Sequence, residues 1–338
     1  MSSAPSWMLY GAAGYTGTLI TEHARERGHQ PLLAGRNAPA ITALGERFDL
    51  PHQTLALDDP AALHAALTDV DLVLNAAGPF LHTSSPLAEA CLRAGAHYLD
   101  ISNELRVFST MYDLDERARQ ADVAIIPGVG FGVVATNCVA LHVSDAVGGA
   151  MELEVASRAA TAQPGPGVAA TRQENMVFGG WIRRAGQLEP LELGLETTTI
   201  TLPDGPYTLM PVPTGDLEAA FQATGAPSVT AYTVIVDPGA LDPQASDEEN
   251  AQPPTHHSFG WARATGSDGA TAQALLQTGE SYVFTATSSI RAVEEVLAGT
   301  RRGALSPAAA FGTNFPLTFP DTSRTDAIAP ESPPANAS

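Results

Sequence analysis

The sequence predicts an α/β protein in which a doubly wound parallel sheet precedes an α+β domain with a mainly antiparallel sheet. Up to about Gly148, short apolar runs alternate with amphipathic segments, as in sheets whose strands are joined by crossover helices. Beyond that point strand-like runs dominate. The length of 338 residues also suits two domains better than one.

The elements of the first domain, expected over residues 1–148, follow from apolar runs and helix signals. The predicted strands cover residues 7–10, 31–34, 54–57, 72–76, 98–101 and 123–126. The predicted helices cover residues 15–27, 38–47, 60–67, 86–94, 111–120 and 135–147. Gly95 stands at the end of one of these helices, where glycine readily adopts the left-handed conformation.

The second domain is expected over residues 149–320. Its predicted strands cover residues 153–156, 197–202, 207–210, 229–236 and 257–263, and one amphipathic helix covers 282–297. We expect the segment 300–320 to pack back on the first domain. The acidic, proline-rich residues 237–254 are typical of a mobile loop. Residues 321–338 are expected to form a disordered tail.

Composition excludes several classes of protein. Hydrophobic residues make up 44% of the chain, which excludes disorder as the dominant state. No apolar run reaches the ~18 residues of a membrane span, and the N-terminus lacks the basic region of a secretory signal. Cys91 and Cys138, both in predicted helices, form no zinc or disulfide pattern. We therefore expect a cytoplasmic protein.

The charge balance is acidic, with 37 acidic residues against 17 basic ones and a net charge of -20. All the basic residues are arginines, an absence of lysine that we ascribe mainly to compositional bias. An acidic surface disfavours nucleic acid and anionic membranes as partners. Schiff-base chemistry and a P-loop lysine are excluded. Arginines, hydroxyls or backbone N–H groups must hold any bound anion.

A glycine-rich turn, Gly11-Ala-Ala-Gly14-Tyr-Thr-Gly17, follows the first predicted strand and opens the first predicted helix. This context is typical of a Rossmann-type dinucleotide-binding domain, in which the pyrophosphate lies at the helix N-terminus. The alternative is a glycine-rich turn without a ligand. We assign the cofactor contacts of this loop to Gly11, Gly14, Tyr15, Thr16 and Gly17.

The end of the second predicted strand indicates which dinucleotide binds. An NAD site usually carries an acidic residue there for the ribose 2′-hydroxyl, whereas this chain has Arg36 followed by Asn37. Because a guanidinium binds phosphate in a bidentate manner, these residues predict NADP(H). The alternative is a solvated arginine that stacks on the adenine of NAD.

Small residues follow the fourth predicted strand in the run Asn75-Ala-Ala-Gly78-Pro79-Phe80. They permit close approach to the ribose or nicotinamide of the cofactor. We therefore add Ala77, Gly78 and Pro79 to the cofactor contacts, with an ordinary strand-to-helix turn as the alternative.

These motifs together give the chain a resemblance to a known family. It resembles the saccharopine dehydrogenase-like NADP-binding oxidoreductases, which include trans-acting enoyl reductases. The segments that carry the resemblance are 7–17, 31–37, 75–80, 91–104, 125–140 and 305–312. The family implies a Rossmann domain, a mainly antiparallel second domain and often a homodimer.

The chain departs from the family pattern at two positions. Gly132 and Asn137 stand where many relatives carry aspartates. Two carboxylates are thus missing near the expected cleft between cofactor and substrate. Any mechanism that depends on those carboxylates does not transfer to this chain.

Candidates for a proton donor follow the fifth predicted strand: Asp100, Ser102, Asn103 and Glu104. The carboxyl ends of parallel strands face the ligand cleft. Glu104 and Asp100 are the catalytic candidates, since a desolvated carboxyl can act as a general acid. The alternative for Glu104 is a structural cap or an ion pair, and Asn103 is expected to contact the cofactor.

Other polar residues give weaker indications. His142 is expected to be a structural helix residue, and His256-His257 lacks a third partner at ligand spacing, so no metal is expected. Four residues are placed in or near a helical stretch, where they could bind an acidic or phosphopantetheine-linked substrate or simply face solvent. They are Arg172, Trp181, Arg183 and Arg184.

The leading hypothesis is an NADP(H)-dependent reductase of a C=N or activated C=C bond in a small-molecule or carrier-bound substrate. One alternative is an NADPH-binding sensor or scaffold without catalysis, which the missing carboxylates favour. The other is a true saccharopine-type amino-acid dehydrogenase, which would need several cations for its carboxylates.

Overall fold

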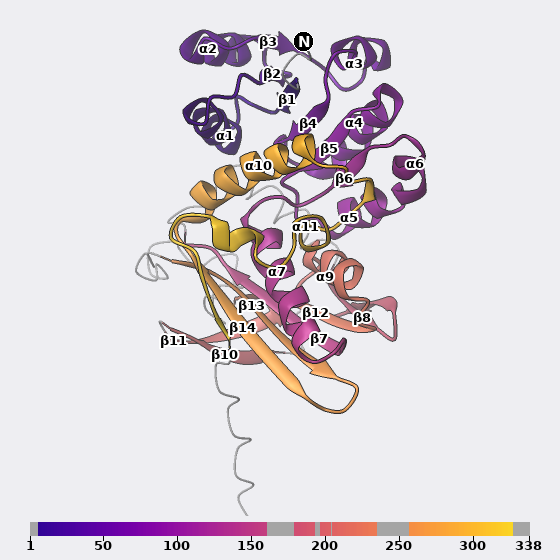
Figure 1. Cartoon of the computed structure of the whole chain (residues 1–338), viewed down its shortest axis with the longest axis vertical. Helices are drawn as coiled ribbons and strands as arrows, with labels where there is room; N and C mark the ends of the chain where they lie inside the picture. The colour runs from indigo at the N-terminus through magenta and orange to yellow at the C-terminus, as the bar shows by residue number, and fades with distance from the viewer. Residues whose placement is uncertain (1–5, 161–178, 193–196, 204, 235–256, 327–338) are drawn as a thin grey trace, which may run out of the picture.

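The computed structural model describes residues 6–160, 179–192, 197–203, 205–234 and 257–326. Two sheets dominate it, a parallel one built mostly from the first part of the chain and a larger mixed one from the second part. Figure 1 shows the first sheet with its helices above and the second sheet below, with helices between them. The loop 237–254, the end of the tail, Arg172 and His256 lie outside the described residues.

The first sheet has the strand order β15-β6-β5-β4-β1-β2-β3 and is parallel throughout. Its strands are β1 (Trp7–Tyr10), β2 (Leu32–Gly35), β3 (His52–Thr54), β4 (Leu72–Asn75), β5 (His97–Asp100), β6 (Ala124–Ile126) and β15 (Gly303–Ala304). The helices are α1 (Tyr15–Glu26), α2 (Ala38–Phe48), α3 (Pro60–Ala66), α4 (Phe80–Ala94), α5 (Leu105–Tyr112) and α6 (Asp115–Gln120). The doubly wound prediction is confirmed. The chain reverses direction across the sheet between β1 and β4, which creates a crevice at their carboxyl ends.

Two helix predictions are wrong in the first domain. Helix α4 begins at Phe80 rather than at residue 86, and Pro86 lies inside it. The apolar residues Phe80, Leu87, Ala88 and Cys91 are all buried on one side of α4, and this burial outweighs the hydrogen bond that Pro86 cannot donate. The single helix expected over 111–120 is in fact α5 and α6, separated by Asp113 and Leu114.

The second sheet has the order β10-β11-β12-β7-β13-β14-β16, and the β8–β9 hairpin joins it beside β12. Its pairs are antiparallel except β12 with β7, so the mainly antiparallel α+β prediction is confirmed. The strands are β7 (Ala150–Arg158), β8 (Gly180–Arg184), β9 (Gln187–Leu191), β10 (Thr198–Leu202), β11 (Gly205–Pro211), β12 (Ser228–Val234), β13 (Ser258–Gly266), β14 (Thr271–Thr278) and β16 (Ser323–Asp326). The helices are α7 (Phe131–Ala146), α9 (Asp216–Thr224), α10 (Ser281–Ala298) and α11 (Pro307–Phe311).

Two further predictions are corrected in this domain. Trp181, Arg183 and Arg184 lie on strand β8, not on a helix. Ala185 and Gly186 both have positive φ, 47° and 80°, which is the conformation of a two-residue hairpin turn. The tail is not disordered from its start, because Ser323–Asp326 pair with β14.

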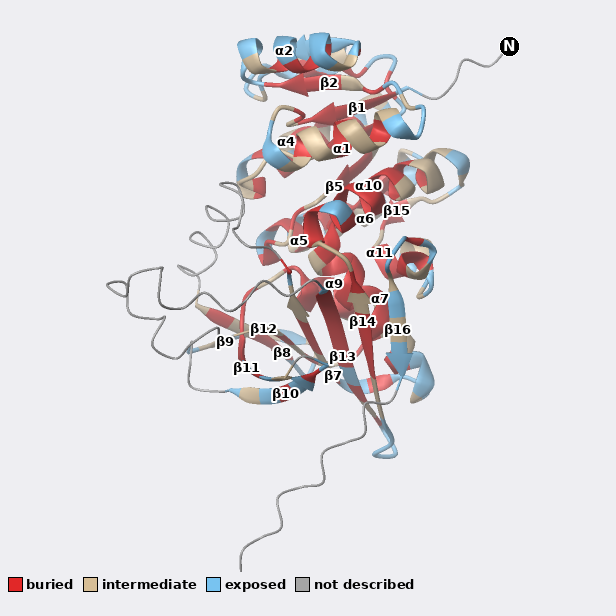
Figure 2. Ribbon diagram, turned by 90° about the vertical axis from the view of Figure 1, so that its left-hand side faces the viewer, coloured by how far each residue is buried: buried red, intermediate tan, exposed pale blue. Residues whose placement is uncertain are grey.

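Helix α7 lies between the sheets and is buried on almost all sides. Its residues Val134 and Cys138 belong to the same apolar cluster as Leu9 of β1 and Ala262 of β13. The two domains therefore share one continuous core. Figure 2 shows the buried strands of both sheets around this helix, while α2 and the hairpin tip of β13 and β14 are exposed.

Helix α10 returns to the first domain and is joined to α1 by ion pairs. The Glu294 carboxylate accepts hydrogen bonds from Arg27 Nε at 2.8 Å and Nη2 at 2.9 Å. His29 Nε2 lies 3.0 Å away, and Arg291 Nη1 donates at 2.9 Å. Burial alone would raise the pKa of Glu294, but hydrogen bonds from Arg27 and His29 with the charges of Arg27 and Arg291 lower it to about 2.

The low pKa of Glu294 predicts a pH-dependent contribution to stability. Because the folded-state pKa lies below the ordinary 4.5, the contribution is complete above pH 4.5 and is lost as the pH falls towards 2. Glu294→Gln should lower the free energy of unfolding by ~1–2 kcal/mol at pH 7, and by progressively less below pH 4.5. Urea denaturation at pH 7 and pH 3.5 measures this, with Glu26→Gln as the exposed control. An equal loss at both pH values would contradict the prediction.

Candidate functional site

The glycine-rich turn brings the β1–α1 loop against the β4–α4 loop. Gly11 has a φ of 82°, and a Cβ there would lie 2.7 Å from the Ala77 backbone nitrogen. A Cβ at Gly17 would lie 2.3 Å from the Gly11 carbonyl oxygen. Both distances exclude a side chain. The loop can therefore be this tight only because glycine occupies both positions.

The amino end of α1 is left open at this loop. Gly14 precedes the helix in extended conformation, and no side chain caps the first N–H groups. Gly14 and Tyr15 are exposed. Unpaired N–H groups and the positive end of the helix dipole together favour a phosphate. The loop thus fits the pyrophosphate of a dinucleotide.

The predicted cofactor contacts Arg36 and Asn37 lie beside this loop. The carbonyl of Ala34, next to them on β2, accepts a hydrogen bond from the Gly11 N–H at 2.8 Å. Arg36 is exposed and has no ion-pair partner among the described residues. Asn37 Oδ1 instead accepts from the Ala40 N–H at 3.3 Å and caps α2. Arg36 is therefore the better placed of the two to contact a phosphate.

The predicted contacts after β4 lie at the crevice where the strand order reverses. Ala77, Gly78 and Pro79 are all partly exposed, and the backbone of Ala77 lies against Gly11. Asn75 Oδ1 accepts a hydrogen bond from the Ala77 N–H at 3.0 Å and fixes the loop. The structure thus brings the two predicted cofactor loops together.

Asp100 is the centre of a buried hydrogen-bond network. Its carboxylate is fully buried and accepts from Ser102 N and Oγ, Gly128 N, Ser84 Oγ and Tyr98 Oη. Burial raises the pKa of Asp100, and the hydrogen bonds from Ser102 and Gly128 oppose that rise. With these donors around it and no place in the lining of the pocket described below, the geometry favours a structural role over that of proton donor.

Glu104 has a different environment. Its Oε1 accepts from the Phe80 N–H at 3.1 Å, at the start of α4, and its Oε2 accepts from the Asn103 N–H at 2.9 Å. The side chain of Asn103 donates from Nδ2 to Asp216 Oδ2 at 3.1 Å, while its Oδ1 is buried without a partner among the described residues. Glu104 thus caps the start of α4 through the Phe80 N–H, and it also lines the pocket described next.

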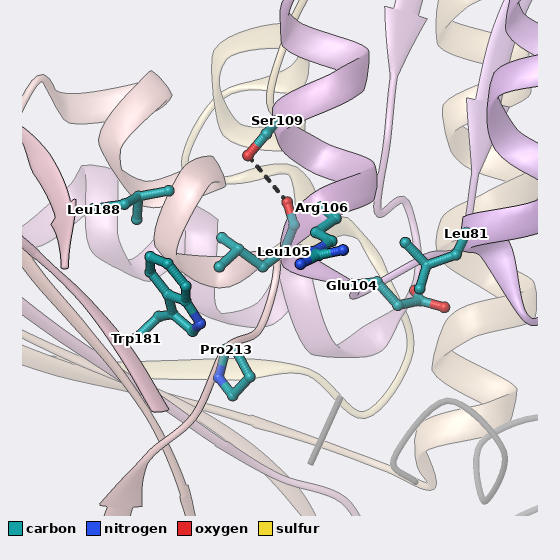
Figure 3. Close-up of a pocket in the computed structure, with 8 residues that line it drawn as sticks. All are labelled: Leu81, Glu104, Leu105, Arg106, Ser109, Trp181, Leu188 and Pro213. Carbon is teal, nitrogen blue, oxygen red and sulfur yellow. Dashed lines mark hydrogen bonds between the residues drawn. The ribbon is translucent and has the colours of Figure 1, made fainter. Parts of the chain in front are cut away.

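The pocket lies between the two domains and has a volume of about 150 Å³. It is lined by Leu81, Glu104, Leu105, Arg106 and Ser109 of the first domain and by Trp181, Leu188 and Pro213 of the second. Figure 3 shows the apolar side chains around the cavity and the Glu104 carboxylate beside Leu81. Pockets at domain boundaries commonly hold the substrate. Sequence reasoning named Glu104 and Trp181 and missed the other six, since no spacing signal joins them: Leu81, Leu105, Arg106, Ser109, Leu188 and Pro213.

The two missing carboxylates belong to positions 132 and 137, where Gly132 and Asn137 have other contacts. Asn137 donates from Nδ2 to the Ala219 carbonyl and accepts from the Ala308 N–H, both at 2.8 Å. Gly132 faces the Asn103 side chain. A carboxylate from α9, Asp216, accepts hydrogen bonds from Asn103 and Thr136 instead. No pattern in the sequence marks Asp216.

The remaining candidates lie elsewhere. His142 pairs with Asp326 across 3.0 Å, far along the chain from the cofactor loops. Among the residues that the structure describes, no His, Cys, Asp and Glu side chains form a group able to hold a metal. Both cysteines are buried, which raises the pKa of Cys138 to about 12 and that of Cys91 further. Neither thiol is poised as a nucleophile.

Comparison with known proteins finds a family match in the first domain. Residues 7–126 match the family described as Saccharopine dehydrogenase NADP binding domain. This part of the chain is therefore similar to the NADP-binding domain of that family. The match spans β1 to β6 and includes both cofactor loops.

The chain is also similar to curated proteins over this region. It is 28% identical to the Trans-acting enoyl reductase of Mycobacterium ulcerans over 138 residues, or 38% of this chain and 33% of the relative. It is 28% identical to the Saccharopine dehydrogenase-like oxidoreductase of Bos taurus over 164 residues, or 43% of this chain and 38% of the relative. The matches therefore span between a third and two fifths of these relatives' length.

The whole architecture has a counterpart among solved structures. Apo saccharopine dehydrogenase (L-Glu forming) from Saccharomyces cerevisiae aligns over 96% of this chain and 100% of its own, with a TM-score of 0.62 and 13% identity. The likeness therefore confirms the fold in both domains. Of the helices in the described ranges, none has the length and apolarity needed to cross a membrane.

The contacts of Asp100 predict that its substitution affects folding. Asp100→Asn places amide hydrogens against groups that already donate, which should lower the free energy of unfolding by ~2–4 kcal/mol. Asp113→Asn, at an exposed position, should change it by less than about 0.5 kcal/mol. Chemical denaturation measures both. Full stability of Asp100→Asn with loss of activity would instead indicate a part in the chemistry.

Proposed function

We propose that the protein is an NADP(H)-dependent oxidoreductase that reduces a C=N or activated C=C bond. The observation that supports this most is the pocket between the domains, with Glu104 in its wall, in a chain whose first domain binds NADP. NADPH, when bound, supplies the hydride. The substrate would lie in the pocket, presented to the nicotinamide at the carboxyl edge of the first sheet.

In this proposal, cofactor binding and proton transfer are assigned to different residues. The open amino end of α1 holds the pyrophosphate, and Arg36 binds the 2′-phosphate. After the hydride reaches carbon, the electron pair of the double bond moves to nitrogen or to the carbon next to the activating group. Glu104 donates a proton to that atom, and solvent reprotonates Glu104 at the end of the cycle.

The assignment of Arg36 is tested by the difference between two cofactors. Arg36→Ala should raise the Kd of NADPH by about tenfold or more, because a bidentate contact with the phosphate is lost. The Kd of NADH should change little, since NADH has no 2′-phosphate. Arg93→Ala, an exposed arginine of α4, is the control. Fluorescence titration measures all the constants, and an equal effect of Arg36→Ala on both cofactors would contradict the assignment.

The role of Glu104 is tested by the dependence of turnover on pH. Glu104→Gln should lower kcat by about a hundredfold and remove one limb of the pH profile, since the amide cannot transfer the proton. Affinity for NADPH should be preserved, and the exposed Glu46→Gln serves as control. If Glu104 only caps α4, the variant will lose stability while the shape of its pH profile stays the same.

Turnover with chemically distinct probes separates the candidate functions. NADPH oxidation is followed with 2-cyclohexen-1-one, Δ1-piperideine, and 2-oxoglutarate combined with lysine. Reduction of either of the first two supports the proposal. Activity with only the last pair would favour the saccharopine-type alternative. NADPH binding without turnover of any probe would favour a sensor or scaffold, the alternative that Gly132 and Asn137 suggest.

A further inference from the structure

The β8–β9 hairpin presents one face to the pocket between the domains. Trp181 and Leu188 both line the pocket. Arg183 is two residues from Trp181 on β8 and directly opposite Leu188 on β9, so these three side chains share a face. Arg184 and Glu189 form an ion pair on the other face, with side chains 60% and 43% exposed.

Arg183 anchors this hairpin through a buried ion pair. Its Nη2 donates to Glu218 Oε1 of α9 at 2.8 Å, and the two side chains are only 8% and 11% exposed. Its Nη1 donates to the Gly186 carbonyl at 2.6 Å, and its guanidinium lies 3.9 Å from the ring centre of Phe221. This set of contacts leaves the guanidinium little freedom to reach a ligand.

The same carboxylate also reaches the first domain. Glu218 Oε1 accepts from Ser109 Oγ of α5 at 3.3 Å, and Ser109 itself lines the pocket. The ion pair therefore connects the hairpin, α9 and α5 behind the pocket wall. A change in this pair should move Trp181 relative to Leu105 without touching the cofactor loops.

We infer that the β8–β9 hairpin determines substrate specificity: Trp181 packs against an uncharged, largely apolar group of the substrate, and the Arg183–Glu218 pair positions Trp181. This inference rests on the proposal that the pocket receives the substrate. Among the described lining residues, Leu81, Leu105, Leu188 and Pro213 are also apolar.

The chemistry and size of the pocket favour this class of group. Glu104 and Arg106 give the lining one acidic and one basic side chain, so it has no excess of positive charge to favour a carboxylate. A charged group held against Trp181, Leu188 and Pro213 would lose its hydration without full compensation. The volume of about 150 Å³ is below the ~300–1,000 Å³ typical of pockets for drug-sized ligands, so a single ring or a short branched chain suits it. A larger substrate would therefore place only its reactive end here.

The inference is tested by ligand binding, so that it does not depend on turnover. Saturation-transfer NMR on the full chain with saturating NADP⁺ gives the Kd of 2-cyclohexen-1-one, with glutarate as the charged probe. Trp181→Ala should raise the Kd of the enone by about tenfold, and Trp181→Phe should restore binding to within about threefold of wild type. Glutarate should not compete.

The anchoring pair is tested with matched substitutions. Glu218→Gln should raise the Kd of the enone by about fivefold, whereas Glu189→Gln, the same change in the exposed pair of the hairpin, should leave it within about twofold. The Kd of NADPH should be the same in all variants, and thermal melts show whether each one is folded. If Glu218→Gln does not fold, the two Trp181 variants still decide the inference.

The outcomes separate this inference from the proposed function. Equal binding of the enone by wild type and Trp181→Ala, or no binding by wild type with NADPH binding intact, overturns the inference alone. Tighter binding of glutarate than of the enone also overturns it. Loss of NADPH binding by the wild type would instead overturn the proposed function.

Discussion

The rest of the structure depends on the burial of α7 between the two sheets. From Phe131 to Ala140 this helix is buried around almost its whole circumference, which requires cover on every side. Strands β1 and β4 of the first sheet and β7, β13 and β14 of the second contribute to one core with it. Both sheets are therefore held at fixed positions relative to each other. The walls of the pocket come from α4 and α5 of the first domain and from β8 and β9 of the second. Because this packing fixes the two domains relative to each other, it also fixes the shape of the pocket.

Two buried carboxylates near one loop show how hydrogen-bond partners distinguish roles that the sequence leaves open. Asp100 is the last residue of β5 and Glu104 follows this strand, so both are acids at the carboxyl edge of a parallel sheet. Asp100 is surrounded by donors from β5, α4 and the loop after β6, whereas Glu104 accepts from two backbone N–H groups and lines the pocket. The difference comes from residues distant in sequence, such as Phe80 and Gly128, so local spacing could not predict it.

The sequence predicts the first domain better than the second for a physical reason. Parallel strands joined by helices have local signals: the strand before Gly11, the Asn37 cap and the glycine after α4 all mark their own elements. The β8–β9 hairpin has no such pattern, since Trp181 lines a pocket and Arg183 forms an ion pair, so these residues do not alternate as apolar and polar ones do on a strand that covers a core. Its turn at Ala185 also lacks the usual asparagine or glycine at the first position. Trp181 could be named as a candidate from the sequence, but its place in the pocket wall and the role of Asp216 follow only from the folded chain.

The path of the chain between the sheets has a consequence for its modularity. After β6 the chain leaves the first sheet, returns through α10 to add β15 beside β6, and then leaves again to place β16 beside β14. Each sheet is thus completed by a strand that arrives late in the sequence. A fragment cut after β6 would expose the backbone edge of that strand and the surface of α1 that α10 covers, which invites edge-to-edge aggregation. Each domain has its own sheet, but neither domain is one continuous segment of the chain. Evolution or engineering could therefore exchange a domain only by exchanging several segments at once.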